Sequence, residues 1–521
     1  MADAVGELEA IIARTALKYD LLPYESKPFP VSQPSRIGGI ARLFGLEAAA
    51  MDNARVLELG CASGGNIIPH AARYPNATFV GVDLARTQVA AGRARIARMG
   101  LTNVEILCKS FTEIGEELGS FDYIICHGVY SWVPHQVQDA IMQVVRARLS
   151  PVGIACISYN VLPGWRMMQP IRDALLMAVP ESVDSLGRVR MAREMLVFLA
   201  EASTDKGPYG DSLRSWAERL ATLPDDYLAH EFLEECNEPL LVRDFAGAAA
   251  RHGLGFLGEC ELSTMILDNY EAKVADGIRA RSGNDMVASE QWLDLLSGRT
   301  FRQTLLIAGE RMNDVNRALT PESLAGLHFV LPIGSIVKRD GDSATITLPD
   351  TRSITSHAPA VADMFEVIGK ALPGSTAFDG LVKDASTDGR AAIGDALYRM
   401  VLGGLCNVSS EAVPCAAVVS NMPVASLTAR SDAEAGNALA TNIRHETVGI
   451  DAASRVILPM LNGKTDHKSL EVKLLAAAKA GELTYSRDGE AITEAKILRS
   501  TIAEHLPNLL SGIANTGLLE S

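Results

Sequence analysis

A glycine-rich turn preceded by an acidic residue is the first place where this sequence could do chemistry. The residues read Glu58-x-Gly60-x-x-x-Gly64-Gly65 and follow an apolar run of strand length at 55–59. A helical pattern comes directly after the turn. A strand, a glycine turn and a helix make the first unit of an open α/β sheet, which binds its ligand at the carboxyl end of the strand. The turn is therefore expected to approach a ligand.

Two nucleotide-like ligands compete for this geometry. A dinucleotide site has the pattern Gly-x-Gly-x-x-Gly, whereas here Ala62 takes the place of the second glycine. Glu58 would repel a pyrophosphate. It would suit S-adenosylmethionine, which has no phosphate and carries an ammonium and a sulfonium. Asp83, which ends the next apolar run, can accept both ribose hydroxyls. A turn of this shape without a ligand is the alternative.

Length and charge limit the classes of function. The chain has 521 residues, which is more than one core usually supports, so two or three domains are expected. The formal net charge is −15 and no lysine or arginine cluster stands out, so a nucleic-acid partner is not expected. A negative net charge is compatible with a basic protein segment or a small molecule as the substrate. The sequence has neither a cationic, apolar secretory start nor a long apolar run, which indicates a cytoplasmic protein without membrane insertion.

The eight cysteines have no spacing typical of a metal site. No Cys-x-x-Cys occurs and no histidine partner is near, so no metal is expected. Cys61, Cys108, Cys126 and Cys156 fall at or near predicted strand ends. They are expected to be buried free thiols of a reducing cytoplasm.

Strand and helix patterns alternate after the turn and predict an α/β fold. Further strands are expected at 78–83, 104–108, 121–127 and 153–159, with helices between them. After a stretch of helical patterns, extended apolar runs return at 255–260 and 301–308. The prediction is a doubly wound, mostly parallel, seven-stranded Rossmann-like sheet whose last two strands form an antiparallel edge.

Three regions are expected along the chain. Residues 1–45 hold a helix and a proline-rich segment at 24–35, which is either a linker or a strap over the ligand pocket. Residues 46–310 form the α/β domain, with a helical insertion at about 180–245 that acts as a lid over the carboxyl end of the sheet. Residues 320–521 are expected to form α+β, winged-helix-like modules that contact proteins.

Several motifs resemble one family of enzymes. The order Glu58-x-Gly60 followed by Asp83 resembles class I S-adenosylmethionine-dependent methyltransferases. The narrower resemblance is to bacterial methyltransferases with a methyltransferase regulatory domain, typified by protein-lysine methyltransferases that modify surface proteins. The segments that carry it are 28–34, 127–134, 159–165, 227–239, 443–446 and 457–463.

The resemblance implies a set of residues for S-adenosylmethionine. Asp83 would hold the ribose, Leu84 and Phe111 the adenine, and the backbone of the turn and the end of the fourth strand the methionyl part. The complete expected set is Glu58, Gly60, Cys61, Ala62, Gly64, Gly65, Asn66, Asp83, Leu84, Ser110, Phe111, His127, Gly128, Val129 and Trp132. Cys61 and Ala62 stand where many methyltransferases have a third small glycine contact, which should alter the loop shape slightly without preventing cofactor binding.

The methyl acceptor is expected beyond the ends of the fourth and fifth strands. The residues assigned to acceptor chemistry there are Tyr130, His127, Tyr159, Asn160 and Trp165. Aromatic faces stabilise a cation by roughly 0.5–2 kcal/mol each, and a lysine must lose its proton before it attacks. Core packing is the alternative role of these aromatic side chains, and a structural role is the alternative for His127.

An acidic run lies within the expected insertion, at Glu231, Glu234, Glu235 and Glu238. It would attract a basic peptide, or it is a solvated helix face.

The function indicated by the resemblance is N-methylation of lysine side chains in a protein. A small-molecule methyltransferase is the second possibility, and a cofactor-binding scaffold that recruits protein partners is the third. A dehydrogenase is the weakest alternative. The acceptor and the oligomeric state are not determined by the sequence.

Overall fold

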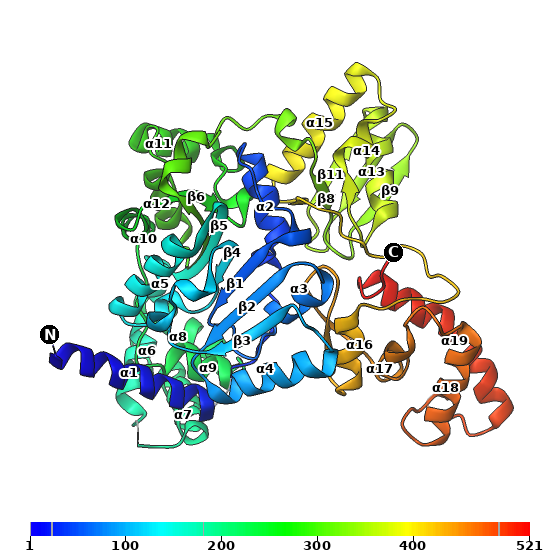
Figure 1. Cartoon of the computed structure of the whole chain (residues 1–521), viewed down its shortest axis with the longest axis horizontal. Coiled ribbons are helices and arrows are strands. Elements are labelled where there is room, and N and C mark those ends of the chain that lie inside the picture. Colours follow the sequence, from blue (N-terminus) through cyan, green and yellow to red (C-terminus); the bar gives the residue numbers. More distant parts are fainter. Residues whose placement is uncertain (1, 22–23, 181, 488–489) are drawn as a thin grey trace.

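A seven-stranded sheet forms the centre of the protein. The computed structural model describes residues 2–21, 24–180, 182–487 and 490–521. The strands lie in the order β3-β2-β1-β4-β5-β7-β6 (Figure 1). Their bounds are β1 Arg55–Leu59, β2 Thr78–Asp83, β3 Val104–Cys108, β4 Phe121–Cys126, β5 Leu149–Asn160, β6 Leu254–Glu259 and β7 Phe301–Ala308. The predicted seven-stranded, mostly parallel α/β fold is confirmed.

The predicted antiparallel edge is confirmed, and the pairing defines the direction of each strand in it. Strands β1 to β5 are parallel, and β7 runs antiparallel to both of its neighbours, β5 and β6. The edge strand β6 therefore points in the same direction as β5. Only β7, inserted between them, is reversed, because the chain enters β7 from the opposite end of the sheet after the helices that follow β6.

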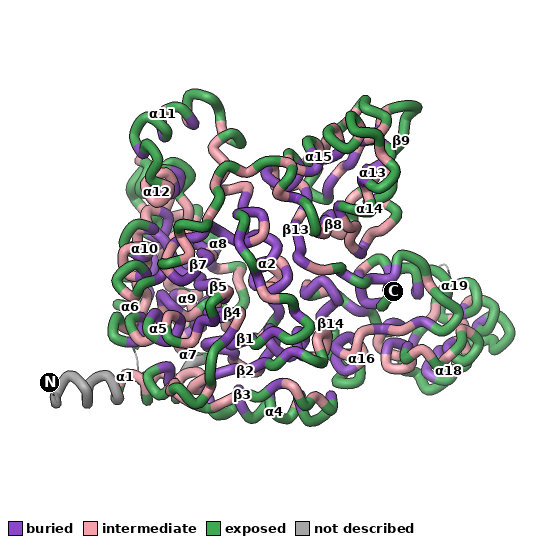
Figure 2. Tube along the Cα trace, turned by 45° about the horizontal axis from the view of Figure 1, so that its top comes forward, coloured by how far each residue is buried: buried purple, intermediate pink, exposed green. Residues whose placement is uncertain are grey.

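Alternating side chains give the sheet two buried faces, as a strand with helices on both sides requires. Val56 belongs to one hydrophobic cluster and its neighbour Leu57 to the other. The first face is covered by α2 (Pro34–Leu43), α3 (Ile67–Arg73) and α4 (Arg86–Met99). The second is covered by α5 (His135–Arg148) and α10 (Val242–Arg251). Figure 2 shows the central strands as mostly buried between these layers.

A group of helices after β5 has a hydrophobic cluster of its own, which includes Trp165, Leu196 and Leu228. The helices are α6 Gln169–Ala178, α7 Ser185–Ala202, α8 Pro208–Ala221 and α9 Asp225–Phe232. We propose 169–232 as the limits of the insertion, in place of about 180–245. Two further helices, α11 (Ala272–Ser282) and α12 (Met286–Ser297), connect β6 to β7.

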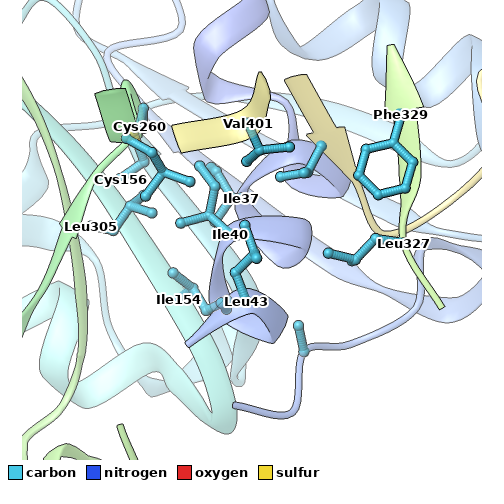
Figure 3. Close-up of a cluster of buried hydrophobic side chains, with 14 of the residues drawn as sticks. Ile37, Ile40, Leu43, Ile154, Cys156, Cys260, Leu305, Leu327, Phe329 and Val401 are labelled. Carbon is cyan, nitrogen blue, oxygen red and sulfur yellow. Dashed lines mark hydrogen bonds between the residues drawn. The ribbon is translucent and has the colours of Figure 1, made fainter. Parts of the chain in front are cut away.

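The next module shares its core with the first face of the sheet. Its strands and helices are β8 His328–Val330, β9 Ile336–Asp340, β10 Ser343–Thr347, β11 Ser353–Ser356, α13 Pro359–Ala371, β12 Thr376–Ala377, α14 Phe378–Val382, α15 Thr387–Leu402 and β13 Asn407–Ser409. Ile37 and Ile40 of α2 lie between Cys156 of the sheet and Val401 of α15 (Figure 3). Helix α2 thus connects the two modules through apolar contacts.

The C-terminal module has a separate core and extends away from the sheet (Figure 1). Its elements are α16 Leu427–Glu434, β14 Leu439–Thr441, β15 Thr447–Gly449, α17 Ala452–Ile457, α18 His467–Lys479, β16 Ser486–Arg487, β17 Glu490–Ala491 and α19 Ala495–Asn515. Helices followed by a short hairpin agree with the predicted winged-helix-like organisation.

The N-terminal helix α1 (Ala2–Leu21) lies beside α4 and the insertion (Figure 1). Asp20 near its end accepts hydrogen bonds from the backbone N–H and the hydroxyl of Thr87, at 2.8 and 2.7 Å. The proline-rich segment then leads to α2. None of the helices in the described parts of the chain is both long and apolar enough to cross a membrane.

The cysteines correct one prediction. All eight are free thiols, and Cys61, Cys126 and Cys156 are buried as expected, but Cys108 is exposed. It is the last residue of β3, where the strand emerges from between the helix layers.

A buried ion cluster joins α12 to the edge of the sheet. Arg302 of β7 is buried completely. Its guanidinium donates to Glu259 at 2.7 Å, to Glu290 at 2.9 Å and to Asp294 at 2.8 Å. Buried charges are tolerated only when they are paired and hydrogen-bonded. Arg302 therefore supplies the positive charge and the hydrogen bonds that allow the three acids to be buried.

We expect Arg302→Met to lower the free energy of unfolding by about 3–5 kcal/mol, because Glu259 loses its buried cation and Glu290 and Asp294 keep only the longer contacts with Arg299, at 3.6 and 3.3 Å. Arg339→Met is the matched control, since Arg339 pairs with the exposed Asp363 at 2.9 Å and should lose no more than about 1 kcal/mol. Urea denaturation measures both. Equal, small losses would contradict a structural role for the cluster.

Candidate active site

A cavity of about 530 Å³ opens at the carboxyl ends of β1, β2, β4 and β5. This volume is within the range of pockets that bind small molecules and cofactors. The expected site residues that line it are Glu58, Gly60, Cys61, Ala62, Asn66, Asp83, Leu84, Phe111, His127, Gly128, Val129, Trp132, Asn160 and Trp165. Residues from five separate segments of the chain therefore meet at the carboxyl ends of these strands.

Glu58 is the most unusual of these residues because its carboxylate is almost completely buried. Its Oε1 accepts a hydrogen bond from Asn66 Nδ2 at 2.8 Å. Its Oε2 has no hydrogen-bond partner among the described residues. Burial raises the pKa of Glu58 to about 8, against the opposing effect of the Asn66 hydrogen bond. A cationic ligand group would satisfy the free oxygen.

The turn after β1 is shaped by left-handed backbone conformations. Gly60 has φ +76°, and a Cβ there would stand 2.3 Å from a methyl carbon of Val129. Ala62 also has a positive φ, of 47°, which is unusual for a residue with a side chain. The carboxylate of Asp83 compensates by accepting from Ala62 N at 2.8 Å and from Ala85 N at 2.9 Å. Asp83 therefore ties the turn to the end of β2.

Asp83 and Leu84 lie where a ribose and a base would be expected. Burial raises the pKa of Asp83, and the backbone donors oppose this shift. Leu84, Phe111 and Gln88 line the adjoining wall. Ser110 is not part of the lining; its hydroxyl accepts from Thr112 N at 3.3 Å and so caps the helical turn that carries Phe111.

Gly64 and Gly65 also lie behind the lining. Gly65 N donates to Ser26 Oγ at 2.7 Å, and a Cβ on Gly65 would stand 2.3 Å from the carbonyl carbon of Ser26. A Cβ on Gly64 would meet Ile68 at 2.6 Å. Both glycines allow close packing of the turn, one against the proline-rich segment and the other against α3, and neither faces the cavity.

His127 lies at the end of β4 between two aromatic rings. The ring centroids of Phe29 and Phe301 are 3.9 and 5.7 Å from that of His127. Burial and the nearby Lys27 lower the pKa of His127 to about 4. Its Nδ1 has no hydrogen-bond partner within the described ranges. The imidazole is therefore neutral at pH 7 and is a weak proton acceptor.

Tyr130 and Tyr159, which were expected to act on the acceptor, do not line the cavity. Tyr159 is buried, stacks on Phe245 at 3.8 Å and forms a hydrogen bond with Thr304 at 3.0 Å between the hydroxyl oxygens. Tyr130 packs edge-on against the same phenylalanine. Both therefore face the α10 side of the sheet. Tyr159 does so as a residue of β5, and Tyr130 does so from the short helical turn Tyr130–Trp132 that follows β4. Their assignment to acceptor chemistry does not agree with this geometry.

Asn160 and Trp165 do line the cavity. Asn160 Nδ2 donates to Asn237 Oδ1 at 3.0 Å. Trp165 packs edge-on against Trp132, with ring centroids 6.1 Å apart, and also contacts Phe232 of α9. This wall connects the sheet to the insertion, so its tryptophans both pack the insertion and face the cavity.

The N-terminal segment closes the opposite side. Phe29 N donates to Asn66 Oδ1 at 2.9 Å, and the carbonyl of Tyr24 accepts from Gln88 at 2.9 Å. Tyr19 of α1 stacks on His230 of α9, with ring centroids 4.9 Å apart. Of the two possibilities that the sequence left open for residues 24–35, the strap over the pocket is the one observed.

The insertion contributes an acid to the cavity. Glu231 of α9 lines it together with Tyr24, Tyr227 and Trp216. Burial raises the pKa of Glu231 to about 7, so the carboxyl group changes charge near neutral pH. A half-buried acid among aromatic rings is a suitable site for a cation.

The rest of the acidic run has other partners. Lys18 lies 3.7 Å from Glu234 and 3.9 Å from Glu235, and Arg14 lies 3.5 Å from Glu235. These two acids therefore hold α1 on the insertion. Of the run, Glu231 is the residue that reaches the cavity.

Many lining residues were not identified from the sequence. The further lining residues are Thr15, Tyr19, Tyr24, Glu25, Ser26, Lys27, Phe29, Ala85, Gln88, Val133, Met168, Trp216, Arg219, Leu220, Leu223, Tyr227, His230, Glu231, Phe232, Thr300 and Phe301. Most come from α1, the strap, α8 and α9. The strap and the insertion were expected near the pocket, and Glu231 belonged to the acidic run, but the sequence did not show which of their side chains face the cavity. No cluster of three or more possible metal ligands occurs among the residues that the structure describes.

Models of known domains match three parts of the chain. The model described as "Methyltransferase domain" matches residues 56–153, "Predicted methyltransferase regulatory domain" matches 224–308, and "PKMT, C-terminal winged helix domain" matches 421–518.

Similar proteins cover almost the whole length. The uncharacterized protein RP789 of Rickettsia prowazekii is 32% identical over 519 residues, which is 96% of this chain and 93% of that protein. A structure of PKMT2 from Rickettsia typhi in complex with AdoHcy has a TM-score of 0.83 and 27% identity, and the match covers 95% of this chain and 100% of that one. A second structure of PKMT2 from Rickettsia typhi has a TM-score of 0.84.

The raised pKa of Glu58 predicts a pH-dependent stability. The folded protein holds this proton more tightly than the unfolded chain, whose glutamate has a pKa near 4.5. Stability should therefore fall as the pH rises from about 5 toward 8, by up to about 1.4 kcal/mol per pH unit from this group. Glu58→Gln should remove that part of the slope.

Thermal or urea unfolding at pH 5.5, 6.5 and 7.5 measures the slope. Glu105→Gln, at an exposed position of β3, is the control and should keep the slope of the unaltered protein. Parallel pH profiles for all three proteins would contradict the buried, proton-binding state of Glu58.

Proposed function

This chain belongs to the family of class I methyltransferases with a methyltransferase regulatory domain and a PKMT winged helix domain, and we propose that it methylates lysine side chains of a protein. It is an S-adenosylmethionine-dependent methyltransferase. The likeness to PKMT2 over 95% of the chain supports a protein acceptor. The observation that carries the proposal is a single cavity that holds both Glu58 and Glu231.

The residues around Glu58 fit the methyl donor. The free Oε2 of Glu58 is a buried acceptor that suits a donor cation. The positive φ values of Gly60 and Ala62 turn the backbone around the place of the methionyl part. The carboxylate of Asp83 retains lone pairs for ribose hydroxyls after binding two backbone amides. Leu84 and Phe111 provide an apolar wall for the base.

S-adenosylmethionine would supply a methyl group on a positively charged sulfur, for transfer in line to a neutral amine: the N–C bond forms as the C–S bond breaks, and S-adenosylhomocysteine leaves. The chain's contribution to such a reaction is mainly positioning, since orientation of two bound reactants can supply several kcal/mol. His127, Gly128 and Val129 follow β4 and line the cavity. The strap and α1 exclude water from the opposite side.

Glu231 is assigned to the acceptor. Its carboxylate would attract a lysine ammonium, and the faces of Tyr24, Tyr227 and Trp216 would surround the aliphatic stem. Because the acceptor must be neutral when it attacks, its proton has to leave first. A carboxyl group with a pKa of about 7 is well matched to receive a proton near neutral pH. His127, with a pKa of about 4, is a poorer match.

Methyl transfer to protein is tested directly with isotopically labelled S-adenosylmethionine. Purified protein is incubated with separate protein and metabolite fractions of a bacterial lysate, and acid hydrolysates of labelled proteins are analysed for methyl-lysine. Label on lysine in proteins is the expected result. Label confined to metabolites would replace the proposal with a small-molecule methyltransferase, and binding without transfer would indicate a scaffold.

Asp83→Ala should weaken the binding of S-adenosylhomocysteine by about 1–3 kcal/mol, since ligand hydroxyls and two backbone amides lose their acceptor. Isothermal calorimetry measures the affinity. Asp342→Ala, at an exposed turn between β9 and β10, is the control and should bind normally. An unaltered affinity of Asp83→Ala would remove this residue from the ribose site.

Glu231→Gln should raise the KM for a lysine-bearing protein about 10- to 160-fold, which corresponds to about 1.5–3 kcal/mol, the contribution of a hydrogen bond to a charged group. The carboxyl is neutral below pH 7 and ionised above it, so the KM of the unaltered protein should fall as the pH rises from 6 to 8. In Glu231→Gln this fall should be smaller.

The matched control is Glu218→Gln, which removes an acid from the exposed side of α8. It should leave the KM and its pH profile unaffected. If both substitutions act alike, general charge attraction rather than a specific acceptor site would explain the effect.

A further inference from the structure

A hairpin of the C-terminal module reaches the loop that follows β1. Strands β14 and β15 pair in antiparallel register, and His445 lies in the turn between them. His445 Nε2 and Asn66 Oδ1 are 2.7 Å apart, and both side chains are buried. His445, which is far from Glu58 in sequence, is thus in direct contact with Asn66, the hydrogen-bond partner of Glu58.

The hydrogen bonds of Asn66 determine which way its amide points. Its Oδ1 accepts from the backbone N–H of Phe29 at 2.9 Å, which can act only as a donor. Its Nδ2 donates to Glu58 Oε1 at 2.8 Å. Since Oδ1 is the atom that faces His445, the imidazole must carry its proton on Nε2 and donate. Burial, together with His70 and Arg73, lowers the pKa of His445 far below its usual value, which agrees with a neutral ring.

The turn that carries His445 is held on several sides. Its ring stacks on His70 of α3, with centroids 3.7 Å apart. Arg73 donates to the carbonyl of Ile443 at 3.0 Å, and Gln33 of the strap donates to the carbonyl of Arg444 at 2.8 Å. The imidazole is therefore held in position by α3, the strap and its own hairpin together.

We propose that His445 is a positioning residue of the methyl-donor site, which orients the Asn66 amide so that its Nδ2 faces Glu58. This inference rests on the proposed function, because it assigns Glu58 to the donor. Without His445, the Phe29 N–H is left to hold Oδ1 away from Glu58. A turned amide would then bring its oxygen toward the ionised carboxylate that binds the donor cation, which is repulsive. The C-terminal module then completes the donor site and is more than an attached protein-contact domain.

The contact also predicts coupling between donor binding and the hairpin. If donor binding and the docked hairpin stabilise the same orientation of Asn66, each should strengthen the other by the same factor. Binding at Glu58 should therefore slow amide hydrogen exchange in residues 439–449, although the hairpin itself contributes no lining residue to the cavity.

The test compares His445→Leu with His445→Gln in the full-length protein. Residue 445 has a φ of +63°, so both substitutions carry a similar backbone cost, and only glutamine can donate to Asn66. We expect His445→Leu to weaken the binding of S-adenosylhomocysteine at least tenfold, and His445→Gln to stay within threefold of the unaltered protein. Hydrogen exchange at 439–449 should respond to the ligand in the unaltered protein and in His445→Gln.

Each outcome decides one of the two proposals. Equal affinities for the leucine and glutamine variants, whether both normal or both weak, would overturn the positioning role while leaving the methyltransferase proposal intact. An unaltered protein that does not bind S-adenosylhomocysteine would overturn the donor site itself. If His445→Leu does not fold, His445→Asn replaces it, because the shorter amide cannot reach Asn66 from the same turn; the expected tenfold difference from glutamine is the same.

Discussion

The hydrogen bond from the Asn66 amide to the buried carboxylate of Glu58 is the interaction around which the site is assembled. A carboxylate that is removed from water needs partners, and Glu58 has one internal partner and one free oxygen. The strap binds the same amide through Phe29, and the C-terminal module binds it through His445. Three distant segments are thus arranged around one acid at the end of β1.

The cavity places two acids in different surroundings. Glu58 is held by a polar network that belongs to the sheet, the strap and the C-terminal hairpin, whereas Glu231 is surrounded by aromatic residues of the insertion and the strap. Burial raises the pKa of both. A methyl donor that carries a cation and an acceptor that arrives as one can therefore be bound in one cavity by separate carboxylates.

The modules differ in how they are attached to the sheet. Helix α2 connects the first face of the sheet to the next module by apolar contacts, while the ion cluster around Arg302 fastens α12. By contrast, ion pairs of partly exposed Arg14 and Lys18 hold α1 on the insertion. Exposed pairs are weak, so α1 depends as well on the hydrogen bonds of Asp20 with Thr87 and on the stacking of Tyr19 on His230.

The sequence by itself determined the order of strands and helices and the position of Glu58 and Asp83 at strand ends, because periodicity and glycine turns are local properties. It did not determine which way Tyr130 and Tyr159 face, since a strand end has two sides and packing against Phe245 selects one. It placed Glu231 on a lid without singling it out from the rest of its acidic run, and it did not bring Tyr19 or His445 to the site. Those residues are far from the glycine turn in sequence, and only the packing of the strap, insertion and C-terminal module against the sheet makes them neighbours.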